Sequence, residues 1–213
     1  MNHQMIVKGL NAGLKILKRR IVDLSHDHSP LFVYLAGSTG SGKTHVTNQL
    51  SGYLDLDITI LPLDDYYLDA SLMKVEKNGF INWDTPDSLD LPNIKRDLEL
   101  LRQSKDILKP IYDMALSKCI GYEPLLAKNI IVVDGAHALN DDIVDSPSVK
   151  VYVEAKESIR LNRKLKRDFH VRKKGEADFI RRYFYETSLP THEIFIYPTK
   201  KNADIIIENN QTR

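Results

Sequence analysis

The sequence has a single cysteine, no long apolar run and no signal-peptide pattern. Cys119 has no second cysteine to pair with, so an internal disulfide is excluded and a reducing compartment is expected. The longest apolar runs, such as 130–133, fall far short of the roughly 20 residues that a membrane-spanning helix needs. Basic side chains interrupt the first 20 residues, which excludes the apolar stretch of a signal peptide. We therefore expect a cytoplasmic protein with no membrane partner.

The sequence also lacks an excess of charge of either sign. Its 30 Lys and Arg residues against 29 Asp and Glu residues give a formal net charge of +1. Such a balance argues against a dedicated nucleic-acid-binding protein, so no nucleic-acid partner is expected. Of the 213 residues, 42% are hydrophobic and 28% are charged, which is typical of a soluble globular domain with a sizeable core.

Five apolar runs predict the strands of a sheet. They are continuous rather than alternating, which is typical of strands buried on both faces, so we expect a three-layer α/β fold with a parallel sheet. The runs are 31–36, 58–61, 129–133, 149–153 and 203–207. A helix is predicted over 43–54. A second helix is predicted after the capping residue Asp90, with an apolar stripe of Ile94, Leu98, Leu101 and Leu108.

Residues 5–24 show helical spacing of apolar residues, with basic residues off the stripe. The stripe consists of Ile6, Leu10, Leu14, Leu17, Ile21 and Leu24. A basic amphipathic helix could lie on a membrane, but such a stripe more commonly packs against a core, so a docked helix is favoured. We therefore divide the chain into an N-terminal helical extension, 1–29, and a main domain, 30–213.

Residues 37–44 match the phosphate-binding pattern G-x-x-x-x-G-K-[ST] at every fixed position, between a predicted strand and a predicted helix. In this pattern backbone N–H groups and the helix N-terminus face phosphate oxygens. Lys43 is expected to reach the β- and γ-phosphates, and Thr44 to offer its hydroxyl to Mg²⁺. The alternative is a glycine-rich turn with an incidental lysine. The predicted nucleotide-binding residues are Gly37, Ser38, Thr39, Gly40, Ser41, Gly42, Lys43 and Thr44.

Carboxylates follow two of the predicted strands. Asp134 closes the run 130–133 and suits an acid that holds Mg²⁺ through water, although it could instead start the turn at Gly135. Asp64 or Asp65, after the second strand, could orient an acceptor hydroxyl and take its proton. On an extended chain these two side chains point to opposite sides, so only one can face the γ-phosphate.

A basic stretch over 160–174 suits a lid that closes over a transferring phosphoryl group. A solvated basic face and an RNA-binding patch are the alternatives. A guanine-reading Asn-Lys-x-Asp is absent from the sequence, and the length suits a small kinase. Phosphate loop, acceptor-side carboxylate and basic lid together favour a kinase that transfers the γ-phosphate of ATP to a hydroxyl.

The sequence resembles the uridine kinase and phosphoribulokinase family, most closely its uridine kinase branch. The resemblance extends from about residue 31 to 207 and rests on segments 37–44, 64–67, 82–90, 110–113, 160–172 and 198–207. It implies a five-stranded parallel sheet of order 2-3-1-4-5, a small basic lid at about 167–180, and ATP and Mg²⁺ as cofactors. It implies direct in-line transfer to a small-molecule acceptor and leaves a homo-oligomer open.

Matching motif positions imply the roles of individual residues. The resemblance places the general base at Asp64, a ribose-binding carboxylate at Asp84 and a ring against the nucleobase at Tyr112. By the same matching it adds the acceptor-site residues Tyr67 and Lys164, the catalytic lid arginines Arg167 and Arg172, and the adenine-side residues Thr199 and Lys200.

The identity of the acceptor stays open because Ser117 stands where uridine kinases carry a base-reading histidine. A nucleoside is the first expectation. The alternatives are nicotinamide riboside, pantothenate, glycerate and ribulose 5-phosphate. A non-enzymatic regulator that binds a nucleotide or RNA is a further alternative. The presence of Asp64 beside Lys43, Thr44 and Asp134 argues against it, because a regulator has no need of a general base.

Overall fold

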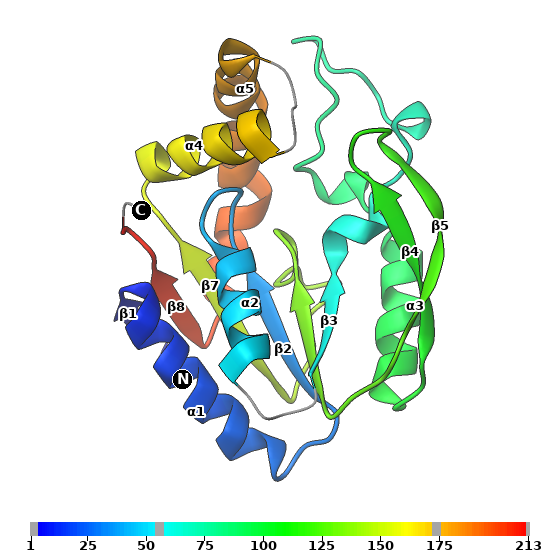
Figure 1. Cartoon of the computed structure of the whole chain (residues 1–213), viewed down its shortest axis with the longest axis vertical. Coiled ribbons are helices and arrows are strands. Elements are labelled where there is room, and N and C mark those ends of the chain that lie inside the picture. The colour runs from blue at the N-terminus through cyan, green and yellow to red at the C-terminus, as the bar shows by residue number, and fades with distance from the viewer. Residues whose placement is uncertain (1–3, 54–57, 172–175, 212–213) are drawn as a thin grey trace.

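The computed structural model describes residues 4–53, 58–171 and 176–211. A parallel sheet of six strands lies between two helical layers (Figure 1). Its strand order is β1-β8-β7-β2-β6-β3. The strands are β1 (Met5–Lys8), β2 (Leu31–Ala36), β3 (Ile58–Pro62), β6 (Ile130–Asp134), β7 (Ser148–Glu154) and β8 (Ile205–Glu208). The expected order of the five predicted strands is confirmed, and the sheet has one more strand, at its β8 edge.

The additional strand corrects the expected N-terminal helix. Residues 5–8 pair in parallel with β8, and helix α1 (Leu10–Ser25) begins only after Gly9. Gly9 has φ of 89°, a left-handed conformation that glycine adopts without strain, so it separates strand from helix. Ile6 is consequently 60% exposed, whereas Val7 is buried. The expectation of a docked helix is met from Leu10 onwards.

Helix α1 shares one face of the sheet with α2 (Lys43–Tyr53). Leu10, Leu17 and Ile21 of α1 join Val46 and Leu50 of α2 in one apolar cluster with the strands. Of the described helices, none is long and apolar enough to cross a bilayer. Helix α2 confirms the helix expected over 43–54 as far as residue 53, and residue 54 lies outside the described residues.

The contact between α1 and β8 is tight at Gly13. A Cβ atom there would lie 2.8 Å from three side-chain atoms of Ile207, which is fully buried. We expect Gly13→Ala to lower the free energy of unfolding by about 1 kcal/mol, because roughly 1–3 kcal/mol of overpacking outweighs roughly 1 kcal/mol of helix propensity. Gly52 in α2 has no atom within 4 Å of such a Cβ, so Gly52→Ala should be neutral or stabilising in urea unfolding. Stabilisation by both substitutions would show that the contact is loose.

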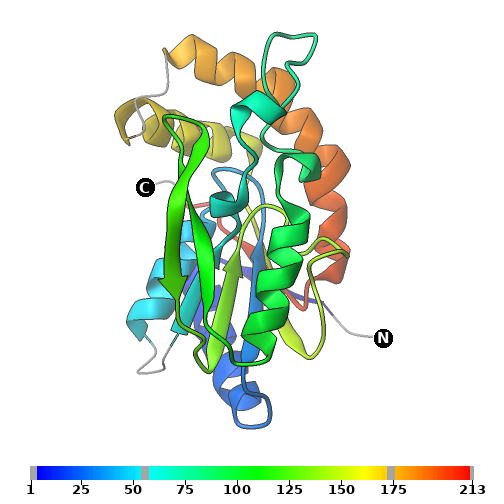
Figure 2. The ribbon, with the colours of Figure 1, turned by 90° about the vertical axis from the view of Figure 1, so that its right-hand side faces the viewer.

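The opposite face of the sheet is covered by α3 (Leu91–Arg102) and the C-terminal helical segment. Asp90 caps α3, as predicted, by accepting a hydrogen bond from the backbone N–H of Asn93 at 3.2 Å. The predicted stripe ends at Leu101, because Leu108 belongs to a strand and is 63% exposed. That strand, β4 (Ile107–Asp113), forms an antiparallel hairpin with β5 (Lys118–Leu125), which the sequence reading missed. Figure 2 shows the hairpin beside α3.

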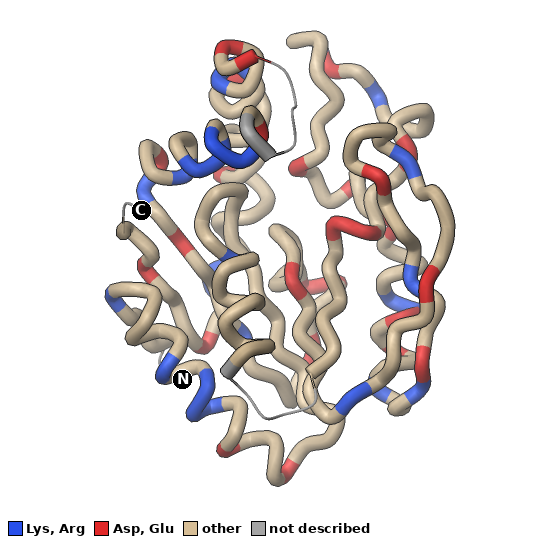
Figure 3. The backbone as a smooth tube through the Cα atoms, in the orientation of Figure 1, with Lys and Arg blue, Asp and Glu red and all other residues tan. Residues whose placement is uncertain are grey.

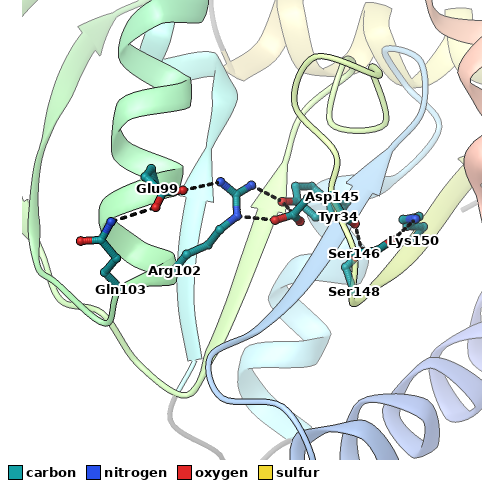
Figure 4. Close-up of polar contacts among 8 residues, drawn as sticks. All are labelled: Tyr34, Glu99, Arg102, Gln103, Asp145, Ser146, Ser148 and Lys150. Atoms are coloured by element: carbon teal, nitrogen blue, oxygen red, sulfur yellow. Dashed lines mark hydrogen bonds and ion pairs between the residues drawn. The ribbon is translucent and has the colours of Figure 1, made fainter.

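A polar cluster fixes the end of α3 against the sheet (Figure 4). Tyr34 of β2 donates to Asp145 at 2.6 Å, and Arg102 pairs with the same carboxylate and lies 5.4 Å from the ring of Phe32. Burial and the Asp145 carboxylate raise the pKa of Tyr34, so its phenol stays protonated and acts as the donor. The cluster therefore fixes α3 on the sheet, and α3 follows the turns that connect it to β3 on the acceptor side of the site.

The rest of the chain after β7 is mostly helical. Helix α4 (Glu157–Leu165) continues as a π-helical segment, Lys166–Val171. Helix α5 (Ala177–Tyr183) leads through Phe184–Ser188, α6 (Leu189–Thr191), His192–Ile196 and Tyr197–Asn202 to β8. Short 3₁₀ turns at Leu63–Tyr66, Ala70–Leu72 and Pro86–Ser88 connect β3 to α3. Of the expected lid, 167–180, residues 172–175 lie outside the described residues.

Candidate active site

The candidate site lies at the carboxyl ends of the central parallel strands (Figure 1). A cavity of about 1160 Å³ opens there. The loop 37–42 follows β2, Asp64 follows β3, and Asp134 ends β6. Because these strands are parallel neighbours, their ends meet at one edge of the sheet. The predicted site residues that line the cavity are Thr39, Gly40, Gly42, Lys43, Thr44, Asp64, Tyr67, Asp84, Tyr112, Asp134, Lys164 and Arg167.

The loop before α2 has the geometry of a phosphate cradle. Gly40 has φ of 75°, and a Cβ there would lie 2.4 Å from the carbonyl oxygen of Arg160, so a side chain has neither the conformation nor the space it needs. Lys43 curls back over the loop and donates to the carbonyl of Gly37 at 2.6 Å. Burial lowers the pKa of Lys43, while the carboxylates of Asp134 and Asp64 act to raise it. The ammonium group is therefore held where phosphate would pair with it.

Two residues hold this loop through contacts that the sequence analysis did not predict, although it counted Arg163 in the basic stretch 160–174. Arg163 of α4 donates to the carbonyls of Gly40 and Ser41 at 3.1 and 3.0 Å. Asn209, directly after β8, donates to the carbonyl of Ser41 at 2.8 Å and accepts from Arg163 through its own carbonyl at 3.1 Å. The parallel topology could have predicted the contact of Asn209, because the carboxyl end of the last parallel strand lies at the same edge of the sheet as the loop.

The described residues suit a Mg²⁺ ion that is bound together with phosphates. Thr44 and Asp134 present oxygen atoms to the cavity, and the Asp134 carboxylate accepts from Thr47 at 2.8 Å. Burial raises the pKa of Asp134, against the effect of Lys43 and Thr47. Within the described part of the chain, no group of three or more His, Cys, Asp or Glu side chains could hold a metal alone. In such sites Mg²⁺ prefers a coordination shell with one or two protein oxygens, and phosphate and water supply the remaining ligands.

Asp64 and Asp65 have different surroundings, although the chain is not extended here as the sequence reading assumed. Both lie in the 3₁₀ turn Leu63–Tyr66, in which Asp64 faces the cavity. Asp65 forms an ion pair with Lys109 of the hairpin at 2.6 Å. Lys109 is buried and also pairs with Glu123 at 2.6 Å. The hairpin therefore anchors the turn that presents Asp64.

An aromatic wall lines the acceptor side of the cavity. The rings of Tyr67, Trp83 and Tyr112 lie with centroids 5.6 to 6.4 Å apart. Ser117, in the hairpin turn, lines the same cavity. Asp84 accepts a hydrogen bond from Ser188 at 2.6 Å, and its carbonyl contacts Nε2 of His137 at 2.9 Å. The wall provides flat apolar surface beside two carboxylates, Asp64 and Asp84.

Basic residues gather along α4, over the loop (Figure 3). Arg167 donates to the hydroxyl of Thr39 at 3.2 Å, and Asp168 accepts from Arg167 at 2.7 Å and from Lys164 at 2.8 Å. Burial alone would raise the pKa of Asp168, but the two cations lower it to about 2. This carboxylate therefore stays charged and orients both cations. Arg172 lies outside the described residues.

The structure does not bring Thr199 and Lys200 to the cavity. The hydroxyl of Thr199 donates to the carbonyl of Ile196 at 2.8 Å, and Lys200 pairs with Glu154 at 2.6 Å. Both residues precede β8, whereas the loop lies beyond its carboxyl end, next to Asn209. The adenine-side roles of these two residues stay a prediction, and Asn209 is the residue after β8 that contacts the loop.

This combination of parallel sheet, strand–loop–helix cradle and acidic strand ends defines a P-loop kinase. The chain belongs to the Phosphoribulokinase / Uridine kinase family, whose model matches residues 32–213. It is 35% identical over 185 residues to a uridine kinase of Lactobacillus helveticus, covering 84% of this chain and 86% of that one. It is 36% identical over 179 residues to a uridine kinase of Staphylococcus epidermidis, covering 81% and 84%.

The fold has close relatives among solved structures. The structure of a possible uridine kinase from Bacillus stearothermophilus superimposes with a TM-score of 0.68 at 16% identity. The match covers 92% of this chain and 98% of the other. Family and fold together identify the chain as an ATP-dependent phosphotransferase with an alcohol group as acceptor.

Proposed function

We propose that the chain transfers the γ-phosphate of ATP to a sugar hydroxyl of a nucleoside. The observation that carries the proposal is one cavity lined by Lys43, Asp64 and Asp84 together with an aromatic wall. The wall suits the flat base of a nucleoside, and the carboxylates suit its sugar hydroxyls. The curated relatives, which are named uridine kinases, support the same acceptor class.

In the proposed reaction the acceptor hydroxyl donates its hydrogen bond to Asp64, which aligns the oxygen with the γ-phosphorus. The new oxygen–phosphorus bond forms as the bond to the bridging β–γ oxygen breaks, the proton passes to Asp64, and ADP leaves. Lys43 and Arg167 stabilise charge on the phosphate oxygens during transfer. Thr44 and Asp134 would hold Mg²⁺, which neutralises the β- and γ-phosphates when bound.

The distribution of cations argues against an acceptor that already carries a phosphate. Among the described residues that line the cavity, the cations are Lys43, Arg163, Lys164 and Arg167. All four belong to the start of α2 or to the α4 region, and none comes from the acceptor-side segments between β3 and β5. A second phosphate, as in ribulose 5-phosphate, would have no cation of its own on that side.

The test of the proposed function is ATP consumption with a panel of acceptors. The panel contains uridine, cytidine, purine nucleosides, nicotinamide riboside, pantothenate, glycerate and ribulose 5-phosphate. We expect turnover with one or more nucleosides and background rates with pantothenate, glycerate and ribulose 5-phosphate. Preferred turnover of a non-aromatic acceptor would contradict the proposal. Nicotinamide riboside belongs in the panel because Ser117 offers only an uncharged hydroxyl near the wall, and aromatic rings also accept a cationic base.

A substitution in the aromatic wall separates binding of the base from chemistry. Stacking on an aromatic side chain contributes about 1–3 kcal/mol per base, so Trp83→Ala should raise KM for the acceptor about 10- to 100-fold. The value of kcat should change little, because Trp83 lies away from the phosphates. Tyr122, 65% exposed on β5 and outside the cavity lining, supplies the matched control Tyr122→Ala. An unchanged KM in Trp83→Ala would place the base elsewhere.

A further inference from the structure

A second, smaller cavity of about 230 Å³ lies beside the phosphate loop. It forms between the end of β7, the start of α4 and the helical segment 189–197, and it shares no lining residue with the active-site cavity. Ser38 is the residue of the phosphate loop that reaches it. The volume is many times the roughly 30 Å³ of one water molecule, so a small solute fits, while a nucleotide does not.

Arg160 is a buried cation that lines this cavity. The residue is 5% exposed, and its guanidinium lies 5.6 Å from the ring centroid of Phe184. Within the described part of the chain, no hydrogen bond or ion pair engages this guanidinium. Burial lowers its pKa, and the carboxylates of Glu193 and Glu157, which act to raise it, belong to exposed residues at the rim. A charge in so buried a residue is costly unless it is paired, so an anion in the cavity would stabilise this arginine.

Tyr152 presents a buried, unsatisfied donor to the same cavity. Its hydroxyl is buried and has no hydrogen-bond partner in the described structure. Ser38 lies close to this hydroxyl and acts to lower the pKa of Tyr152 against the effect of burial, while the Ser38 hydroxyl is engaged by Nδ1 of His192. A buried donor without an acceptor costs about 1–3 kcal/mol. Two donors therefore face one cavity, and both need acceptor oxygens.

We propose that this cavity binds a small oxyanion, a carboxylate or phosphate group, through Arg160 and Tyr152. The guanidinium offers paired N–H groups in the geometry that suits such an oxyanion, and the phenol adds one O–H donor. The exposed carboxylates of Glu157 and Glu193 disfavour a polyanion and limit the ligand to a single oxyanion group. This site is distinct from the site of phosphoryl transfer and does not depend on the identity of the acceptor.

A ligand in this cavity would contact His192, which bonds to Ser38 of the phosphate loop. His192 lines the cavity and bonds to Ser38. Burial, and then the charge of Arg160, lower the pKa of His192 to about 4, so the imidazole is neutral at pH 7. An anion in the cavity would offset the charge of Arg160 beside that imidazole. Binding here is therefore coupled to the conformation of Ser38, and occupancy should change the apparent KM for ATP.

The test measures binding of two probes, inorganic phosphate and acetate, to the full chain. The protein is first saturated with a non-hydrolysable ATP analogue and Mg²⁺, so that the phosphate loop is filled. Calorimetry and melting temperature then report binding at the remaining site, and the two probes distinguish a phosphate from a carboxylate ligand. We expect at least one probe to bind and to raise the melting temperature. Absence of binding by both probes would overturn the proposal.

Substitutions assign the binding to the cavity. Arg160→Gln should abolish it, and Tyr152→Phe should weaken it about 3- to 10-fold, which corresponds to one lost hydrogen bond. Tyr152→Phe without a probe should be at least as stable as the parent, because its hydroxyl has no partner, so this variant keeps the test valid if Arg160→Gln does not fold. Arg181→Gln, at an exposed arginine of α5, is the matched control. Equal binding by the parent and both cavity variants would place the anion elsewhere and reject the assignment.

Discussion

Lys43→Ala is expected to lower kcat by about 10³-fold or more. The ammonium of Lys43 lies over the loop and within reach of its carbonyls, which is the position from which it would neutralise the β- and γ-phosphates during transfer. Removing it takes away a cation that acts most strongly when charge develops on the phosphate oxygens. The measurement is steady-state turnover with the acceptor that the panel identifies.

The fold should survive this change. Lys43 acts on the buried Asp134 carboxylate, but that carboxylate keeps its hydrogen bond from Thr47 when Lys43 is removed. Lys95→Ala, at a surface lysine that pairs with Asp142, is the control and should behave like the parent enzyme. Near-parental turnover by Lys43→Ala, with an unchanged melting temperature, would show that the phosphate loop is not the donor site.

The second large effect on kcat is expected at Asp64 and not at its neighbour Asp65. Asp64→Asn should reduce kcat by about 10²–10⁴-fold, because the amide cannot accept the proton of the hydroxyl. Affinity for ATP should change little, since Asp64 faces the acceptor side. Asp65→Asn should stay within a few-fold of the parent in kcat, because Asp65 points to Lys109 rather than into the cavity.

The two variants should rank in the opposite order when their thermal stability is measured. Asp65→Asn weakens one of the two ion pairs of the buried Lys109, so its melting temperature should fall below that of Asp64→Asn. The experiment thus has two independent readouts on two isosteric variants. If Asp65→Asn loses activity and Asp64→Asn retains it, the roles of the two residues are exchanged. If neither loses activity, the acceptor site does not lie at this turn.

The central sheet and the phosphate loop were predictable because their signals are local. Each central strand is buried on both faces and therefore appears as a continuous apolar run, and the loop pattern requires fixed residues within eight positions. Asp64 and Asp134 were predictable for a related reason, since a polar residue at the end of a buried strand stands out. All of these residues meet at one edge once the strands are parallel.

The missed elements depend on distant partners. Ile6 and Leu10 are spaced as in a helix, and only pairing with β8 shows that residues 5–8 are extended. The hairpin was hidden because it carries exposed apolar residues, Ile120 and Tyr122, while its buried contact with the acceptor turn is made by the charged Lys109.

The contacts of Arg163 and Asn209 with the loop were missed because only the parallel topology, and no local pattern, places these residues beside it. They join residues that lie far apart along the chain and follow no short motif. Thr199 and Lys200 do not line the active-site cavity, so their adenine-side role still rests on the resemblance alone.

The pairing of β1 with β8 also determines when the sheet can be completed as the protein is made. Met5 pairs with Ile205 and Lys8 with Glu208, so strand β1 cannot pair until β8 has been synthesised. Strand β1, and the part of α1 that contacts β8, must therefore remain without their final contacts until β8 has left the ribosome. Closing so long a loop adds little to the equilibrium cost, since that cost grows only slowly with length. The delay is instead kinetic, and nascent chains that stop before residue 205 would expose the unfinished sheet edge to chaperones and proteases.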